Sequence, residues 1–180
     1  KASNERVIAL EAVSRVLEKR KIHPRALQMM LRCLDELLLN AIFDAPQDWS
    51  GKFYRREVAR DAIFPFIKRE KVTMSMAFNQ NFVMVSVLDR FGSFSADRAM
   101  GVLKKDYQSD PYLTNVKTKG AGLGLHGIAS SGVALMISSR PGIETEAVLA
   151  FPYFKSFKET KNCFRSFSFN VRSKPQLVSQ

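Results

Sequence analysis

Two apolar stretches separated by only three polar residues constrain the fold of this chain more than any other feature of the sequence. Residues 71–78 alternate apolar side chains with small or polar ones, and residues 82–89 form a second, more continuous apolar run. Alternation with a period of two places one set of side chains on one face of a β-strand. The pattern therefore predicts a β-hairpin with its turn at Asn79–Asn81, and hence a sheet.

Two helices are predicted before this hairpin. In residues 3–20, charged positions separate apolar ones three or four apart, which is typical of an amphipathic helix with a face of Val7, Leu10, Val13 and Leu17. The sequence KIHP breaks this helix, and Pro24 suits a first helical position. A more strongly apolar helix is then predicted over 25–45, with a face of Leu27, Leu31, Leu34, Leu38 and Ala41.

The rest of the chain gives less regular patterns. Residues 52–70 and 90–120 have no sustained period, so we expect loops with short helical parts there. The remaining elements are predicted as a helix at 125–134 and strands at 134–140, 145–154 and 164–172, the first two strands joined by a turn at Pro141–Gly142. We expect one domain over residues 1–180, with a core at about 25–152 and a C-terminal strand extension at 152–180.

Composition and charge narrow the class of protein. The 46% hydrophobic and 25% charged residues are typical of a folded domain. The 28 basic and 17 acidic residues give a net charge of +11, which favours nucleotides, nucleic acids or acidic protein faces as ligands; a charge that serves only solubility is the alternative. No apolar run has the roughly 20 residues of a membrane span. Cys33 and Cys163 form no metal or disulfide pattern, which suits the cytoplasm, and the start at Lys1 rather than Met predicts a piece of a longer protein.

A carboxylate and an amide one helical turn apart form the first candidate for chemistry. Glu36 and Asn40 project from the same side of the second predicted helix. The amide oxygen of Asn40 would suit Mg²⁺, and the Glu36 carboxylate could accept a proton from water or a hydroxyl group. The alternative is an ordinary pair of solvent-facing side chains, which any amphipathic helix carries.

An acidic residue at a strand end is the second candidate. Asp89 directly follows the apolar run VMVSVL, at a position where sheet proteins place ligand groups. An ionised carboxylate there needs a donor, and the exocyclic amine of adenine is one. The alternative is an Asp that only starts the turn before RFG.

Three glycines at alternate positions are the third candidate. Gly120, Gly122 and Gly124 precede a predicted helix, and their backbone N–H groups could close on phosphate oxygens at the positive helix N-terminus. Lys117 and Lys119 add positive charge. The run matches neither the dinucleotide fingerprint nor the P-loop, because no strand precedes it and no GK[ST] follows.

In this order, the features resemble the GHKL ATP-binding domain that DNA gyrase, heat-shock chaperones, histidine kinases and MutL share. The sequence DELLLNAIFDA (35–45) looks like its N-box, DRFG (89–92) like its first glycine box and GAGLGL (120–125) like its second. IETEAVLAF (143–151) resembles the strand that ordinarily carries Gly-Thr. The resemblance covers residues 25 to about 152. It implies an α/β (α+β) two-layer sandwich of the Bergerat type, a mixed sheet with helices on one face.

The resemblance also implies a role for each candidate residue. Glu36 would be the general base, Asn40 the Mg²⁺ ligand, and Asp89 the acceptor for the adenine amine. Gly92 would let the base approach, and Thr145 would support the adenine site. The other cofactor-binding residues that it implies are Asp44, Lys119, Gly120, Gly122, Leu123, Gly124 and Leu125. The cofactors would be ATP and Mg²⁺.

Three positions depart from the family pattern. Phe91 and Ser93 occupy glycine positions of the first glycine box, and Glu144 stands where the late strand usually has Gly. The Phe91 ring would either stack on adenine or fill the pocket.

Within the family, the compact chain is similar to the anti-sigma-factor serine kinases of bacteria. His23 is expected to be a loop or cap residue rather than a phosphoacceptor, because the residue before a proline disfavours helix. The resemblance implies a cytoplasmic homodimer that binds Mg·ATP and phosphorylates or sequesters a regulatory protein, such as a sigma factor or its antagonist. The alternatives are a non-catalytic nucleotide-sensing or interaction module, and the catalytic domain of a histidine kinase without its phosphoacceptor domain. Nucleic-acid binding ranks last because the basic residues are dispersed.

Overall fold

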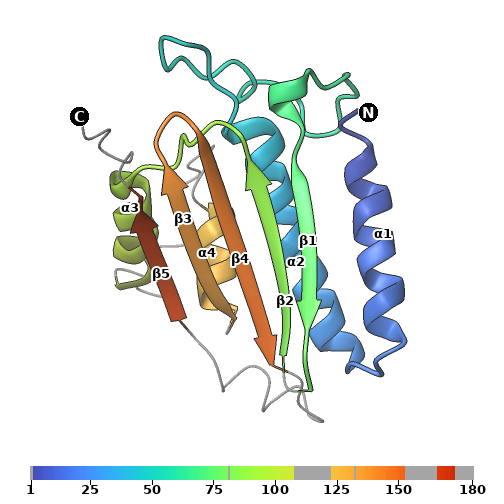
Figure 1. The fold of residues 1–180 in the computed structure, drawn as a ribbon. Coiled ribbons are helices and arrows are strands. Elements are labelled where there is room, and N and C mark those ends of the chain that lie inside the picture. Colours follow the sequence, from blue (N-terminus) through green and yellow to red (C-terminus); the bar gives the residue numbers. More distant parts are fainter. Residues whose placement is uncertain (1, 81, 108–122, 132, 153–165, 173–180) are drawn as a thin grey trace, which may run out of the picture.

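The computed structural model describes residues 2–80, 82–107, 123–131, 133–152 and 166–172. Within these residues the chain forms a five-stranded mixed sheet with helices packed against one face (Figure 1). The expectation of an α+β chain with a mixed sheet and helices on one face is therefore confirmed at this level.

The first two helices lie where the apolar spacing predicted them. They are α1 (Glu5–Glu18) and α2 (Pro24–Leu39), and they pack against each other. The His23 side chain caps α2, because its Nδ1 accepts a hydrogen bond from the Arg25 backbone N–H at 3.2 Å. The prediction of a cap histidine before a first-turn proline is confirmed.

The end of α2 changes its hydrogen-bond pattern instead of stopping. A π-helix, η1 (Asn40–Asp44), continues the chain, and the Ala45 N–H donates to the Asn40 carbonyl at 2.8 Å. The prediction of helix to residue 45 was right in extent. The wider π turn was not predicted, and such turns often occur at functional sites.

The strands run in the order β1-β2-β4-β3-β5, so β1 and β5, the first and last strands of the described residues, form the two edges. β3 and β5 are parallel, and the other neighbours are antiparallel. The register places Asp89 at the end of β2 directly opposite Thr145 on β4. The strands are β1 (Thr73–Phe78), β2 (Phe82–Asp89), β3 (Ala134–Arg140), β4 (Glu144–Pro152) and β5 (Ser166–Val171), each within two residues of the predicted bounds.

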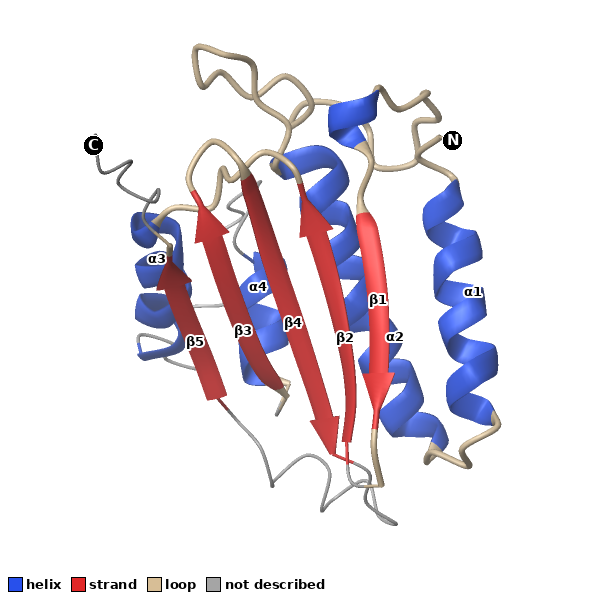
Figure 2. Cartoon of the chain, viewed as in Figure 1, coloured by secondary structure: helices blue, strands red, loops and turns tan. Residues whose placement is uncertain are grey.

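Two further helices complete the helical layer (Figure 2). α2 packs against β2 and β4, α3 (Ala96–Tyr107) against β5, and α4 (Leu123–Ser130) against β3. α4 begins two residues earlier than predicted, so Gly124 lies in its first turn. None of the helices in the described residues is both long enough and apolar enough to cross a membrane.

The sheet has one buried and one open face. Val85, Leu135 and Leu149 face the helices and are at most 1% exposed, whereas Met84 and Met136 on the opposite face are each 40% exposed. This two-sided pattern is typical of sheets covered by one layer. Side chains that enter a site from the sheet therefore do so on the helix side.

The segment before β1 is organised around a buried ion pair. The Arg55 guanidinium lies 2.8 Å from the Glu70 carboxylate and 4.0 Å from the centre of the Phe64 ring. Glu70 also accepts hydrogen bonds from the Tyr54 hydroxyl at 2.9 Å and the Ile67 N–H at 3.0 Å. Of the short helical part predicted at 52–70, the structure has only one 3₁₀ turn, η2 (Lys68–Glu70).

Gly92 lets the loop after β2 approach the turn between β3 and β4. Its φ is +59°, and an added Cβ would collide with the Arg140 carbonyl oxygen and lie 2.7 Å from two further backbone nitrogens, those of Gly142 and Ile143. The Gly142 N–H in turn donates to the Gly92 carbonyl at 3.2 Å. Because all these neighbours are backbone atoms, they cannot rotate away.

Gly92→Ala is expected to destabilise the fold by about 3–4 kcal/mol, since the substitution combines a left-handed φ with a backbone collision. Gly142→Ala is the matched control: its φ is +74°, but an added Cβ meets nothing within 4 Å. That control should cost only about 1 kcal/mol. Urea unfolding of both variants measures the difference, and equal losses would contradict the contact.

Candidate functional site

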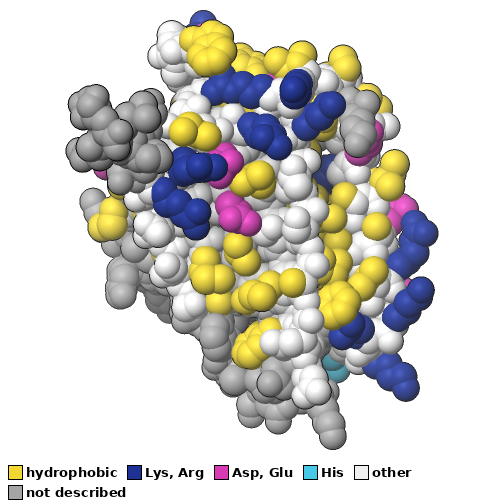
Figure 3. All heavy atoms as spheres, in the orientation of Figure 1, with side chains coloured by type: hydrophobic (Ala, Val, Ile, Leu, Met, Phe, Trp, Pro, Cys, Tyr) yellow, Lys and Arg dark blue, Asp and Glu magenta, His cyan; other side chains and the backbone are white. Residues whose placement is uncertain are grey.

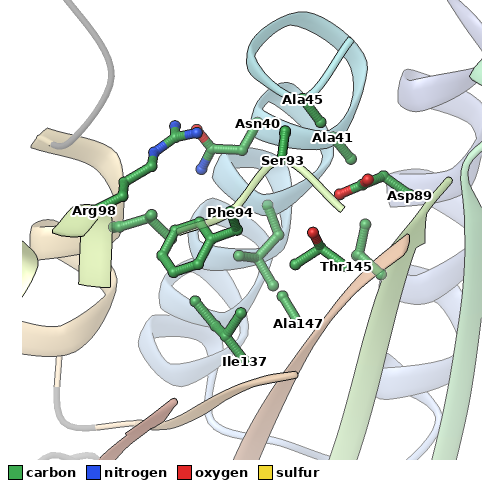
Figure 4. Close-up of a pocket in the computed structure, with 13 residues that line it drawn as sticks. Asn40, Ala41, Ala45, Asp89, Ser93, Phe94, Arg98, Ile137, Thr145 and Ala147 are labelled. Atoms are coloured by element: carbon green, nitrogen blue, oxygen red, sulfur yellow. The ribbon is translucent and has the colours of Figure 1, made fainter. Parts of the chain in front are cut away.

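A small cavity lies between the helical layer and the ends of β2 and β4 (Figure 4). Its polar lining consists of Asn40, Asp89, Ser93, Arg98 and Thr145. The apolar lining comes from both layers: Leu37, Ala41, Ala45, Val87, Phe94, Leu125, Ile137 and Ala147. Helix, strand and loop residues from distant parts of the sequence therefore meet around one space.

Four residues singled out from the sequence share this cavity. Asn40 comes from the end of α2, Asp89 from the end of β2, Leu125 from α4 and Thr145 from the start of β4. The first three come from separate motifs of the sequence, and Thr145 comes from the strand predicted late in the chain. The structure brings them together, as a common binding site would require.

Asp89 both supports a turn and faces the cavity. It is 8% exposed, and its Oδ1 accepts hydrogen bonds from the Phe91 N–H at 2.8 Å and the Gly92 N–H at 3.3 Å. Burial disfavours the ionised carboxylate and raises the pKa of Asp89 to about 6, although these two N–H groups favour the charged form. The two interpretations left open by the sequence, turn residue and ligand-facing acid, thus describe the same side chain.

Three donor or acceptor atoms around the cavity have no hydrogen-bond partner. Within the described part of the chain these buried atoms are Asn40 Nδ2, Arg98 Nη2 and Thr145 Oγ1, although Arg98 Nη2 lies 3.5 Å from the Asp44 carboxylate. The Thr145 hydroxyl lies beside Asp89 and helps to lower the pKa of that acid, but its geometry is too poor for a hydrogen bond. Buried polar groups without partners are rare in native proteins, and a ligand is one explanation for a cluster of them.

The cavity has two chemically different ends. Figure 4 shows the Arg98 and Asn40 head groups close together at one end, and Asp89 with Thr145 at the other. The Arg98 end offers cationic and amide donors, whereas the Asp89 end offers a carboxylate acceptor. A ligand that fits both ends has an anionic group at one end and a donor, such as an amine, at the other.

Asp44 does not line the cavity, although the family resemblance placed it among the cofactor-binding residues. Its buried carboxylate lies 2.8 Å from Arg60 and 3.5 Å from Arg98. Burial lowers the pKa of Arg98, and the charge of Asp44 opposes that shift. Asp44 therefore acts on the cavity only through Arg98, whose guanidinium it neutralises in part.

Glu36 is one helical turn from Asn40 but lies outside the cavity lining. Its carboxylate packs against Gly124 in the first turn of α4, where an added Cβ would collide with Oε2. Burial raises the pKa of Glu36, and the nearby Asp35 raises it further. Because Gly124 has no side chain, there is room beside it for the carboxylate of Glu36, the candidate general base.

The aromatic residue beside the cavity is not the one that the sequence suggested. Phe91 does not line the cavity, so the expectation that its ring fills the pocket is wrong for this structure, whereas stacking on adenine stays a prediction. It is buried instead beneath the Arg69 guanidinium, 4.8 Å from the ring centre. Phe94 lines the cavity, and its ring meets Phe169 of β5 edge to face, with centres 5.4 Å apart.

The other glycine-box residues divide into two groups. Gly92 lies outside the cavity lining, and its backbone contact with the β3–β4 turn accounts for the glycine without a ligand. Lys119, Gly120 and Gly122 lie outside the described residues. Leu123 is the first residue of α4, and nothing is described of its side chain.

Sequence reasoning missed Phe94 and Arg98, which line the cavity, and treated Ser93 only as a departure from the first glycine box. Phe94 and Arg98 lie in the stretch that showed no sustained period, so no pattern marked them. The signal that could have found them is the spacing of Phe94 and Arg98, because the guanidinium lies 5.5 Å from the ring centre at the start of α3. An aromatic and a basic residue four positions apart at a helix start can form such a pair.

The cavity is too small for a nucleotide as it stands. Its volume is about 40 Å³, which is room for about three water molecules. Pockets for ligands of this class have about 300–1,000 Å³. Binding of anything larger than a few waters therefore requires part of the wall to move.

A metal ion would find few ligands among the described residues. They contain no cluster of three or more His, Cys, Asp or Glu side chains that could hold one. Mg²⁺ needs fewer protein ligands when phosphate oxygens and waters supply the rest. Asn40 fits that limited role through its amide oxygen, since the residue lines the cavity.

Comparison with known proteins assigns the chain to no family. No protein-family model matches the sequence, and no curated protein matches it significantly.

Proposed function

We propose that this chain is an ATP-binding signalling domain of the GHKL kind, with the Bergerat fold, and that the nucleotide binds in the cavity beside Asp89. The observation that carries the proposal is the buried Asp89 carboxylate facing a cavity whose other end holds Arg98 and Asn40. Adenine has an exocyclic amine and ATP an anionic tail, which match these two ends. The order of the sequence motifs supports the same proposal.

Different residues of the chain would bind the adenine and the phosphates. Asp89 accepts a hydrogen bond from the adenine amine, and Thr145 supports the same end of the cavity. Arg98 and the amide of Asn40 face the phosphates. Asn40 would help to hold Mg²⁺, which would supply positive charge to neutralise the phosphates.

Binding must enlarge the cavity, and the wall made by Phe94 and Arg98 is the part that has to move. Phe94 lies two residues before α3, and Arg98 lies in its first turn. A displacement of this wall away from β4 widens the space between Asn40 and Asp89. Binding is therefore expected to change the environment of α3.

In the catalytic form of the proposal, the domain is a protein-serine kinase. Glu36 accepts the proton of the attacking hydroxyl group, and a regulatory protein such as a sigma factor or its antagonist supplies that group. The cytoplasm and a homodimer are the setting that the family resemblance adds. If the chain is instead the catalytic domain of a histidine kinase, with its phosphoacceptor domain elsewhere, ATP binds in the same cavity.

A second candidate function is a nucleotide-sensing or interaction module without catalysis. The observation that favours it is the position of Glu36, whose carboxylate packs on Gly124 and does not line the cavity. A base in that position needs the start of α4 to move before it can reach a substrate. The experiment that separates the two measures release of phosphate from ATP. If the chain releases phosphate, and Glu36→Gln abolishes the release without loss of ATP binding, the kinase is favoured over this module.

Calorimetric titration with ATP and GTP, each with and without Mg²⁺, tests the binding proposal. ATP is expected to bind and GTP to bind more weakly, because guanine presents a carbonyl oxygen where adenine presents its amine. Thr145→Val should weaken ATP binding by about tenfold through loss of one hydrogen bond. The matched control is Thr73→Val, an exposed position on the open face of β1, which should leave the affinity unchanged. Equal affinity for both nucleotides, or no binding, would contradict the proposal.

A further inference from the structure

A groove separate from the cavity runs between the start of α1, the end of α2 and the chain that leads into β1. We call it the basic groove. Five cations line it, and they are Arg6, Lys68, Arg69, Lys71 and Arg90. Its volume is about 730 Å³, which is in the range of sites that bind peptides or small ligands.

The charge of the basic groove is poorly compensated. Glu5 is its only acidic lining residue. Arg6 is ion-paired with Asp35, but Lys68, Lys71 and Arg90 are exposed and have no ion pair within the described residues. Figure 3 shows the Lys and Arg side chains gathered at this upper end of the molecule, with apolar side chains among them. An anionic partner would be attracted there.

The floor of the basic groove is apolar. Leu38 and Ile42 come from the helical layer, and Val72 and Met74 come from the chain entering β1. With Phe66 as the one aromatic residue of the lining, the groove offers mainly aliphatic surface rather than a row of rings on which bases could stack. It favours a peptide with apolar side chains over a single-stranded nucleic acid.

One wall of the basic groove is a sheet edge. Thr73 and Met74 of β1 line it, and within the described residues β1 pairs only with β2. The other edge of β1 therefore has backbone groups available to an added strand. Extended peptides bind to such edges through their main chain, and specificity comes from pockets for alternate side chains.

An exposed tryptophan continues this surface. Trp49 is 94% exposed, and Arg69 of the groove lies 4.7 Å from its ring centre. The loop that carries Trp49 is held by Asp48 Oδ1, which accepts from the Ser50 N–H at 2.9 Å and the Lys52 N–H at 3.0 Å. Exposed tryptophans in ordered loops are frequent anchors of protein interfaces.

We propose that the basic groove binds an extended, acidic segment of a partner protein. The segment adds as a strand to the free edge of β1. Its carboxylates face Lys68, Lys71 and Arg90, and its apolar side chains contact the groove floor and Trp49. This interaction does not depend on nucleotide in the cavity.

The test uses a dodecapeptide of alternating glutamate and valine and the full chain. Trp49 is the only tryptophan, so its fluorescence reports on this surface alone. Binding is expected to shift its emission to shorter wavelength and to weaken with salt. A peptide of alternating lysine and valine should not bind. The glutamate peptide with N-methyl groups on alternate residues should lose binding, because it cannot pair with β1.

Charge reversal locates the site. The triple variant Lys68→Glu, Lys71→Glu, Arg90→Glu is expected to weaken binding at least about tenfold. The control reverses three exposed cations elsewhere on α1 and α2, Lys19, Arg25 and Arg32, and has the same net charge. It should change the affinity less than about twofold. Circular dichroism checks that both variants fold.

Three results would overturn the proposal. They are no binding of the glutamate peptide, an equal loss in both triple variants, and tighter binding of a single-stranded oligonucleotide of equal charge at the same residues. Asp89→Asn should leave peptide binding unchanged. Failure of the nucleotide proposal would therefore not be mistaken for failure of this one.

Discussion

Asp89→Asn is expected to stabilise the fold above pH 6 while it weakens ATP binding by about 100-fold. The affinity falls because the adenine amine loses a charged acceptor, and a hydrogen bond to a charged group contributes about 1.5–3 kcal/mol. The stability rises because asparagine can still accept from the Phe91 and Gly92 N–H groups without the cost of a buried charge. Calorimetry and thermal unfolding measure the two effects on one variant.

The pH dependence of stability gives the sharper form of this prediction. The pKa of Asp89 is about 6 in the folded chain, against about 4 for an unfolded one, so between these values the native state binds more protons. Stability of the parent therefore falls as the pH rises from 4 to 6, by about 3 kcal/mol in total. Asp89→Asn should lack this fall, whereas the exposed Asp61→Asn should keep it. A variant profile parallel to that of the parent would contradict the assignment.

Glu70→Ala is expected to destabilise the fold by about 3–5 kcal/mol, because it leaves the Arg55 guanidinium buried without its counter-charge. The substitution also removes the acceptor of the Tyr54 hydroxyl and the Ile67 N–H. Urea unfolding measures the loss. Glu57→Ala, at an exposed position in the same segment, is the control and should cost less than about 0.5 kcal/mol.

A double variant separates the charge from the packing. Replacing both Arg55 and Glu70 with methionine removes the buried charge together with its partner and should recover most of the stability. If the double variant were as unstable as Glu70→Ala, the hydrogen bonds to Tyr54 and Ile67 would be the important interactions, and the ion pair would not.

Much of the fold could be predicted from the periodicity of apolar residues. Alternate burial along β2 and the apolar stripe of α2 both follow from contact with a core on one side, so the spacing of apolar residues in the sequence indicates them. The order of strands could not be predicted in that way, because it depends on pairing between distant segments. The parallel placement of β5 beside β3 is an example.

The sequence predicted residues of the candidate site only where a polar residue type stands at a recognisable place in a helix or strand. Asp89 ends an apolar strand and Asn40 lies one turn after Glu36, and both line the cavity. Phe91 was misjudged because its position in a motif says nothing about which side of the loop its ring takes. Arg98 was missed because its role depends on the fold bringing the first turn of α3 close to Asp44 of η1.

The edge-to-face contact between Phe94 and Phe169 places β5 behind one residue of the cavity wall. A ribosome that has completed the central strands has not yet completed the support of this wall. Val171 must leave the exit tunnel before β5 can form and support Phe94 from behind. Nascent or proteolysed chains that stop at Pro152 would thus retain Asp89, Asn40 and Phe94 but lack Phe169, the ring that supports Phe94 from β5.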